Sequence, residues 1–88
     1  MPTVTGVDDV IDPASMIPVY VQLAGIIRRA IATGQIPPGR AIPSKRALVE
    51  TYGISGSTVD KAVRLLKDEG VLVTVLGKGL YAAPPADS

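Results

Sequence analysis

The chain has 88 residues, 47% of them hydrophobic, which indicates one small domain with a core of Ile, Leu, Val and Ala, since Phe and Trp are absent. It contains neither Cys nor His, which excludes disulfides, the usual zinc sites and Ser–His catalysis, so we expect no enzyme, no metal and no cofactor. The net charge of +1 hides an uneven distribution, because residues 1–16 carry −3 whereas residues 17–83 carry all nine Lys and Arg and a charge of +5.

The two ends of the chain lack the patterns of a folded element. Residues 1–15 show no helical or strand period and are expected to form a flexible acidic N-terminal segment. No signal peptide is visible, and no apolar run approaches the roughly 18–20 residues that span a membrane, so we expect a cytoplasmic protein with no membrane partner. The folded domain is predicted over residues 16–83, and residues 84–88 form a C-terminal tail.

The first predicted element is an amphipathic helix over about residues 18–33. Apolar residues recur there every three or four positions, and Gly34 is a typical stop signal. The following stretch, residues 35–43, contains three prolines and a glycine, which excludes a helix. Pro38–Gly39 indicates a turn, and residues 40–42 are a candidate short edge strand.

Two short helices follow at close spacing. Ser44 stands at the N-cap position of a helix over about residues 44–52, and Gly53 at the position of a left-handed C-cap. Ser55 or Ser57 caps the next helix, at about residues 57–69. A pair of short helices joined by about four residues that include glycine is the helix-turn-helix pattern.

The remaining sequence changes to a strand period. Residues 71–75 are mostly β-branched and apolar, residues 76–79 read as a glycine-containing turn, and residues 80–83 form a returning strand. The predicted fold class is therefore α+β, a winged helix-turn-helix with three helices followed by a β-hairpin wing.

This fold places a candidate DNA-binding set at the helix-turn-helix and the wing. Small hydroxyl residues at the start of the third helix allow close approach to bases and phosphates, and Ser57, Lys61 and Arg64 share one helix face. Two cations in the first turn of the second helix oppose its dipole, which suggests a phosphate outside it. At the wing tip, glycines let the backbone approach DNA beside a lysine. The set predicted to bind DNA is Lys45, Arg46, Ser55, Ser57, Thr58, Lys61, Gly77 and Lys78.

Enzymatic function and protein binding are the two alternatives to DNA binding. Gly77–Lys78–Gly79 has neither the glycine spacing nor the following Ser or Thr of a P-loop, and no carboxylate cluster indicates acid–base catalysis. The main alternative is a winged-helix module that binds another protein, such as an anti-repressor or an assembly factor. No small-molecule ligand is evident.

An ordered set of residues resembles the N-terminal DNA-binding domain of GntR-family transcription regulators over about residues 12–83. The resemblance implies a repressor that binds double-stranded DNA at a pseudo-palindromic operator as a dimer. The sequence leaves open whether the homodimer forms in solution or only on DNA. It also implies that Arg46 contacts DNA. The set comprises Pro18, Tyr20, Gln22, Leu23, Ile27, Arg28, Gly34, Pro37–Gly39, Ile42–Ser44, Arg46, Leu48, Tyr52–Ser55, Thr58, Val59, Ala62, Leu66, Glu69, Gly70 and Gly77–Tyr81.

The sequence departs from this family at two positions of the third helix and in its length. Many members carry arginine where Gly56 and Asp60 stand here. Asp60 could accept a hydrogen bond from a cytosine amino group or pair with Arg64 or Arg46, and we favour the intramolecular pair because an unpaired carboxylate at DNA is costly. The effector-binding and dimerisation domain usual in the family is absent from these 88 residues, as in a short natural regulator or a piece of a longer one.

Overall fold

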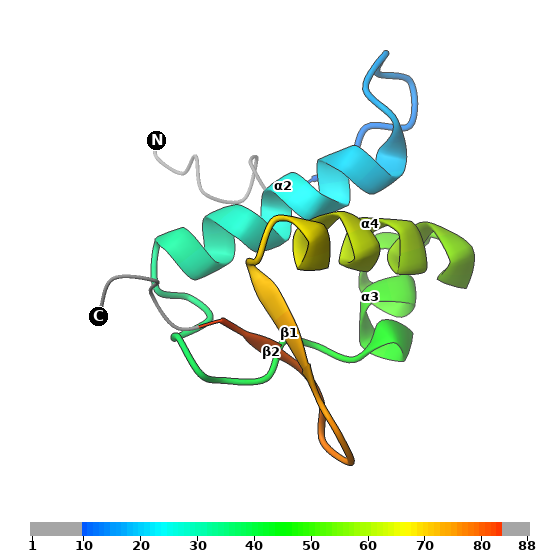
Figure 1. Ribbon diagram of the computed structural model, residues 1–88. Coiled ribbons are helices and arrows are strands. Elements are labelled where there is room, and N and C mark those ends of the chain that lie inside the picture. Colours follow the sequence, from blue (N-terminus) through cyan, green and yellow to red (C-terminus); the bar gives the residue numbers. More distant parts are fainter. Residues whose placement is uncertain (1–9, 84–88) are drawn as a thin grey trace.

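The computed structural model describes residues 10–83, so most of the predicted acidic segment and the C-terminal tail at 84–88 lie outside the described residues. Three helices are followed by two strands, and the hairpin projects away from the helices (Figure 1). The elements are α2 (Val19–Ala32), α3 (Lys45–Tyr52), α4 (Gly56–Asp68), β1 (Leu72–Val75) and β2 (Gly79–Ala82). This is the predicted winged helix-turn-helix.

Helix α2 buries one apolar stripe against the rest of the domain. Leu23, Ala24 and Ile27 are buried, at the three- and four-residue spacings that the sequence showed. The Pro18 carbonyl oxygen accepts from the backbone N–H groups of Val21 and Gln22, so the helix begins directly after the proline. It ends one residue earlier than predicted, with Thr33 as the C-cap.

Side-chain caps define the two helices of the helix-turn-helix. The Ser44 hydroxyl accepts from the Ala47 N–H at 3.1 Å, and the Ser55 hydroxyl accepts from the Thr58 N–H at 3.2 Å. Between these helices, Gly53 adopts φ 65°, a left-handed conformation that a glycine adopts without strain. The caps therefore limit the connection to three residues and fix where each helix starts.

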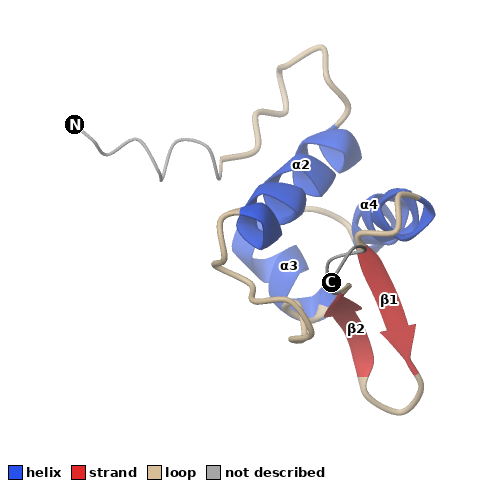
Figure 2. Ribbon diagram, turned by 60° about the vertical axis from the view of Figure 1, so that its left-hand side comes forward, coloured by secondary structure: helices blue, strands red, loops and turns tan. Residues whose placement is uncertain are grey.

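The wing is an antiparallel hairpin with an additional backbone partner on its second strand. Val73 pairs with Tyr81 and Val75 with Gly79, and Ala41 forms an isolated bridge to the other side of Tyr81. The predicted edge strand at residues 40–42 is thus reduced to one bridge, reinforced by an Ile42 N–H to Leu80 carbonyl bond of 3.0 Å. This attaches the wing to the chain just before α3 (Figure 2).

The core lies where α2, α4 and the base of the hairpin meet. Its largest fully buried side chains come from all three parts and are Leu23, Leu66, Leu72 and Val59. Because α4 contributes its inner stripe to this core, its opposite face is left for solvent or a ligand.

The Gln22 side chain and core packing hold the chain upstream of α2. The Gln22 amide accepts from the Asp12 N–H at 2.8 Å and donates to the carbonyl oxygens of Asp12 and Ile17. Ile11 also packs against the core. Packing therefore reaches upstream of residue 16, where the sequence placed the start of the folded domain.

Candidate nucleic-acid interface

The start of α4 carries a cluster of three hydroxyl groups. The Ser55 hydroxyl is hydrogen-bonded to those of Ser57, at 3.1 Å, and Thr58, at 2.9 Å, as well as capping the helix. Thr58 is half-buried, whereas Ser57 is exposed. Ser55 is exposed as well, so both serines are accessible, and Ser55 also orders the group.

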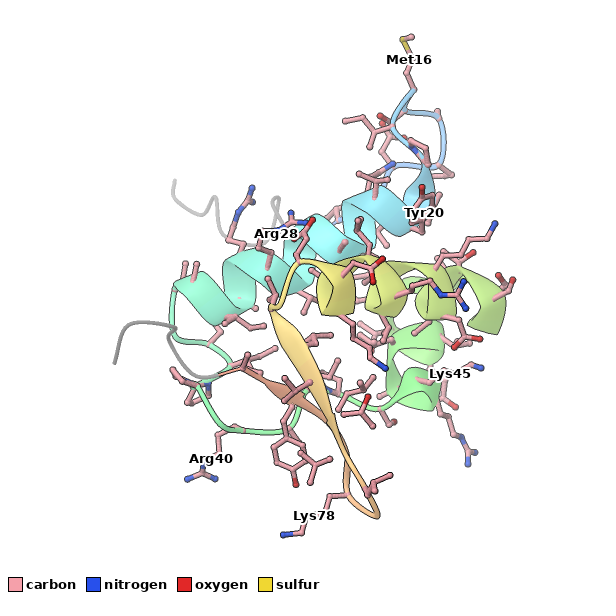
Figure 3. The ribbon with its side chains drawn as sticks, viewed as in Figure 1. Met16, Tyr20, Arg28, Arg40, Lys45 and Lys78 are labelled. Carbon is pink, nitrogen blue, oxygen red and sulfur yellow. The ribbon has the colours of Figure 1, made fainter. Side chains whose placement is uncertain are left out.

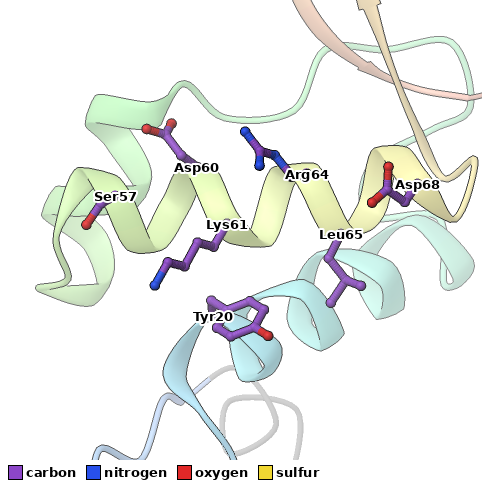
Figure 4. A pocket seen from close by; sticks show the side chains of 7 residues that line it. All are labelled: Tyr20, Ser57, Asp60, Lys61, Arg64, Leu65 and Asp68. Carbon is purple, nitrogen blue, oxygen red and sulfur yellow. The ribbon is translucent and has the colours of Figure 1, made fainter.

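One face of α4 forms the floor of an open groove opposite Tyr20 of α2 (Figure 4). Ser57, Lys61 and Arg64 all line this groove, as their sequence spacing predicted. Within residues 10–83, neither the Lys61 nor the Arg64 side chain forms a hydrogen bond or an ion pair. Arg64 was not in the predicted DNA-binding set, but it is as well placed as Lys61 for an anionic ligand.

Asp60 forms an ion pair with a residue that the sequence did not suggest. Its carboxylate lies 3.1 Å from the Lys45 ammonium at the start of α3. The expected intramolecular pair exists, but the expected partners, Arg64 and Arg46, were wrong. The i,i+4 spacing favoured Arg64 on the same helix as Asp60. Instead, α3 packs on α4 and brings Lys45 of the neighbouring helix to the carboxylate.

Arg46 is the most exposed of the paired cations. It lies 3.4 Å from Glu50 one turn along α3, and its side chain is 88% exposed. An exposed pair of this kind contributes at most about 1 kcal/mol, so it leaves Arg46 available to a phosphate.

The wing tip presents a lysine on a tight glycine-containing turn. The Lys78 N–H donates to the Val75 carbonyl oxygen at 2.9 Å, and Gly77 has φ 77°. Lys78 and Lys45 line one hollow between the wing and the start of α3, and Figure 3 shows Lys78 at the end of the hairpin. Lys78 forms no side-chain hydrogen bond or ion pair with any other residue that the structure describes.

These cations form a continuous surface feature, the basic strip, consisting of Lys78, Lys45, Lys61 and Arg64. The hollow joins Lys78 to Lys45, the ion pair joins Lys45 to Asp60, and Asp60 lines the groove with Lys61 and Arg64. The strip thus runs from the wing to the outer face of α4, the two elements that a winged helix uses to contact DNA.

Arg28 lies outside this strip in a bidentate pair with Glu69. Its guanidinium nitrogens donate to both carboxylate oxygens, at 3.0 and 2.9 Å, and join α2 to the C-cap of α4. No pattern in the sequence links these two residues, which lie 41 positions apart.

Two further properties concern the described part of the chain. Residues 10–83 contain no cluster of three or more Asp or Glu side chains arranged to hold a metal ion. Among them, no helix is both long and apolar enough to cross a membrane. The basic strip is accordingly the site considered below.

The sequence and the fold both match known proteins. Residues 19–81 match the family described as bacterial regulatory proteins, gntR family. The chain is 41% identical over 64 residues to the mannosyl-D-glycerate transport/metabolism system repressor MngR of Escherichia coli, covering 73% of this chain but only 27% of MngR.

Two solved structures have a closely similar fold. YtrA from Sulfolobus acidocaldarius, a GntR-family transcription factor, is similar with a TM-score of 0.81 and 36% identity, over 89% of this chain and 82% of that one. The AraR DNA-binding domain in complex with operator ORX1 has a TM-score of 0.75 and 35% identity, over 82% of this chain and 89% of that one.

Proposed function

Because the chain belongs to the GntR family of DNA-binding bacterial transcription regulators, we propose that it is a repressor that binds a pseudo-palindromic operator in double-stranded DNA. In this proposal the N-terminal end of α4 enters the major groove, and the wing follows the adjacent backbone. Residues 16–83 serve as the DNA-binding domain, with residues 10–15 attached to it through Gln22.

The observation that carries the proposal is the basic strip. Three of its cations, Lys61, Arg64 and Lys78, have no protein partner among residues 10–83, although carboxylates are available on the same surface. Three of the four carboxylates of residues 17–83 instead pair with Arg28, Lys45 and Arg46. These three unpaired cations lie at the wing tip and on the outer face of α4, where phosphates would neutralise them.

The predicted contacts divide into two kinds under this proposal. Lys61, Lys78 and Arg46 supply phosphate contacts, which position the domain without reading the sequence. Ser57 and Thr58, at the start of α4, face base edges, and Gly77 allows the wing backbone close to the duplex. Ser55 acts mainly through the cap and the hydroxyl cluster.

Repression and operator binding are supported by the relatives. MngR is named as a repressor, and the AraR domain of similar fold was solved on an operator. Two copies of the present domain on two half-sites would give an operator with matching two-fold symmetry. The pairing can be confined to DNA, where each copy is held by its own half-site.

Selection of bound duplexes from a random pool tests the proposal. We expect an enriched motif made of two inverted half-sites. A pool that yields no motif, together with capture of a protein partner by the same surface, would support the alternative of a protein-binding module instead.

A further inference from the structure

The Lys45–Asp60 pair lies at the end of α4 that would enter the major groove. The Lys45 Nζ is 3.1 Å from Asp60 Oδ2, and the two side chains are 55% and 63% exposed. An ammonium has three donors and a carboxylate has two acceptor oxygens, so each group keeps hydrogen-bonding capacity for a ligand.

Gly56 determines where the Lys45 side chain lies. A Cβ atom on Gly56 would stand 2.9 Å from Lys45 Cε, closer than side chains normally approach, and 3.5 Å from its Nζ, an ordinary contact distance. Lys45 therefore crosses the first residue of α4, over a position where any larger side chain would displace it. The absent side chain at 56 and the pair at 45 and 60 form one arrangement, the Gly56–Lys45–Asp60 unit.

The charges of the unit do not suit a phosphate. A carboxylate beside an ammonium cancels most of its attraction for a phosphate and repels that phosphate itself. A donor and an acceptor side by side do match the major-groove edge of a G·C base pair. Guanine presents the acceptors O6 and N7, and cytosine presents the N4 amino donor.

We infer that the Gly56–Lys45–Asp60 unit reads one G·C base pair in each half-site, an inference that rests on the proposed function. Lys45 donates to guanine O6 or N7, and the free lone pairs of Asp60 accept from cytosine N4. The existing ion pair holds the lysine in place before DNA arrives, which lowers the entropy lost on binding. This unit takes the place of a direct contact from residue 56.

Three variants test the inference in the complete chain, with duplex selection and anisotropy titrations against the selected site. Lys45→Ala is expected to lower discrimination for G·C at one position of each half-site by about tenfold. Asp60→Asn is expected to weaken the same preference and to raise affinity for unrelated DNA, because it frees Lys45. Lys61→Ala, which removes the same charge, is the matched control and is expected to keep the motif while reducing the salt dependence.

Gly56→Ala is the sharpest variant, because it changes no charge and alanine is favourable in a helix. Its Cβ would displace Lys45, so the G·C preference should fall while the salt dependence stays unchanged. If the wild-type chain selects a motif and Lys45→Ala, Asp60→Asn and Gly56→Ala all select the same motif with the same preference at every position, the inference is overturned. If the wild-type chain selects no motif, the proposed function itself fails.

Discussion

Arg28 and Glu69 form a bidentate ion pair that fastens the middle of α2 to the end of α4. The pair lies at the C-cap of α4, at the opposite end of that helix from Ser55 and Gly56. Arg28→Ala should therefore lower the free energy of unfolding by at most about 1 kcal/mol, as for a partly exposed pair, and leave operator affinity unchanged. Urea denaturation and anisotropy measure the two effects. A clear loss of affinity without a loss of stability would place Arg28 in the interface.

Ser55 caps α4 and lies at the proposed interface, and two substitutions separate these roles. Ser55→Ala removes the cap and should cost about 1 kcal/mol of stability. Ser55→Asp keeps a capping oxygen, so stability should be retained, but its charge should repel DNA and weaken binding at least tenfold. Thermal unfolding with parallel titrations checks this. Equal binding by Ser55→Asp and the wild-type chain would remove this helix start from the interface.

Among residues 10–83, the Arg46 side chain is held only by an exposed pair with Glu50, and a phosphate can replace that partner. Arg46→Ala should weaken operator binding by at least about 1 kcal/mol, by a similar amount for related and unrelated duplexes, and leave the fold intact. Glu50→Gln is the matched control and should strengthen binding slightly. Unchanged affinity of Arg46→Ala with a native circular dichroism spectrum would contradict the assignment.

Lys78 at the wing tip can be compared with Lys67, an exposed lysine in the last turn of α4. Lys78→Ala should lower affinity for all duplexes and reduce the slope of log Kobs against log salt by about 0.9, the value for one phosphate contact. Lys67→Ala removes the same charge at the far end of α4 from Ser55, where Lys67 lines a hollow with Arg64, and should have a smaller effect on both quantities. If the two variants change affinity and slope equally, DNA binding depends on the net charge of the protein and not on a contact made by the wing.

Much of this fold could be predicted from local sequence signals. Ser44, Gly53 and Ser55 each act through neighbours within three or four residues, so the sequence predicts the helix bounds to within one residue, although it left Ser57 as a second candidate cap for α4. The single face of Ser57, Lys61 and Arg64 likewise follows from helical spacing. Long-range partners could not be predicted in this way.

Three contacts illustrate what sequence spacing misses. Asp60 pairs across the helix-turn-helix with Lys45, 15 residues away, because Gly56 leaves space for the lysine stem. Gln22 holds the backbone of Asp12, and Arg28 reaches Glu69, 41 residues away. Each depends on how two elements pack, which no periodicity encodes. The division into phosphate-binding and base-reading residues stays a prediction.

The salt dependence of binding to the selected duplex tests the central claim that Arg46, Lys61 and Lys78 hold the DNA backbone. If Arg46, Lys61 and Lys78 each neutralise one phosphate, log Kobs should fall linearly with log salt with a slope of about −2.7 per domain. Lys61→Ala and Lys78→Ala should each reduce that slope. Affinity that stays flat between low and moderate salt would contradict the account.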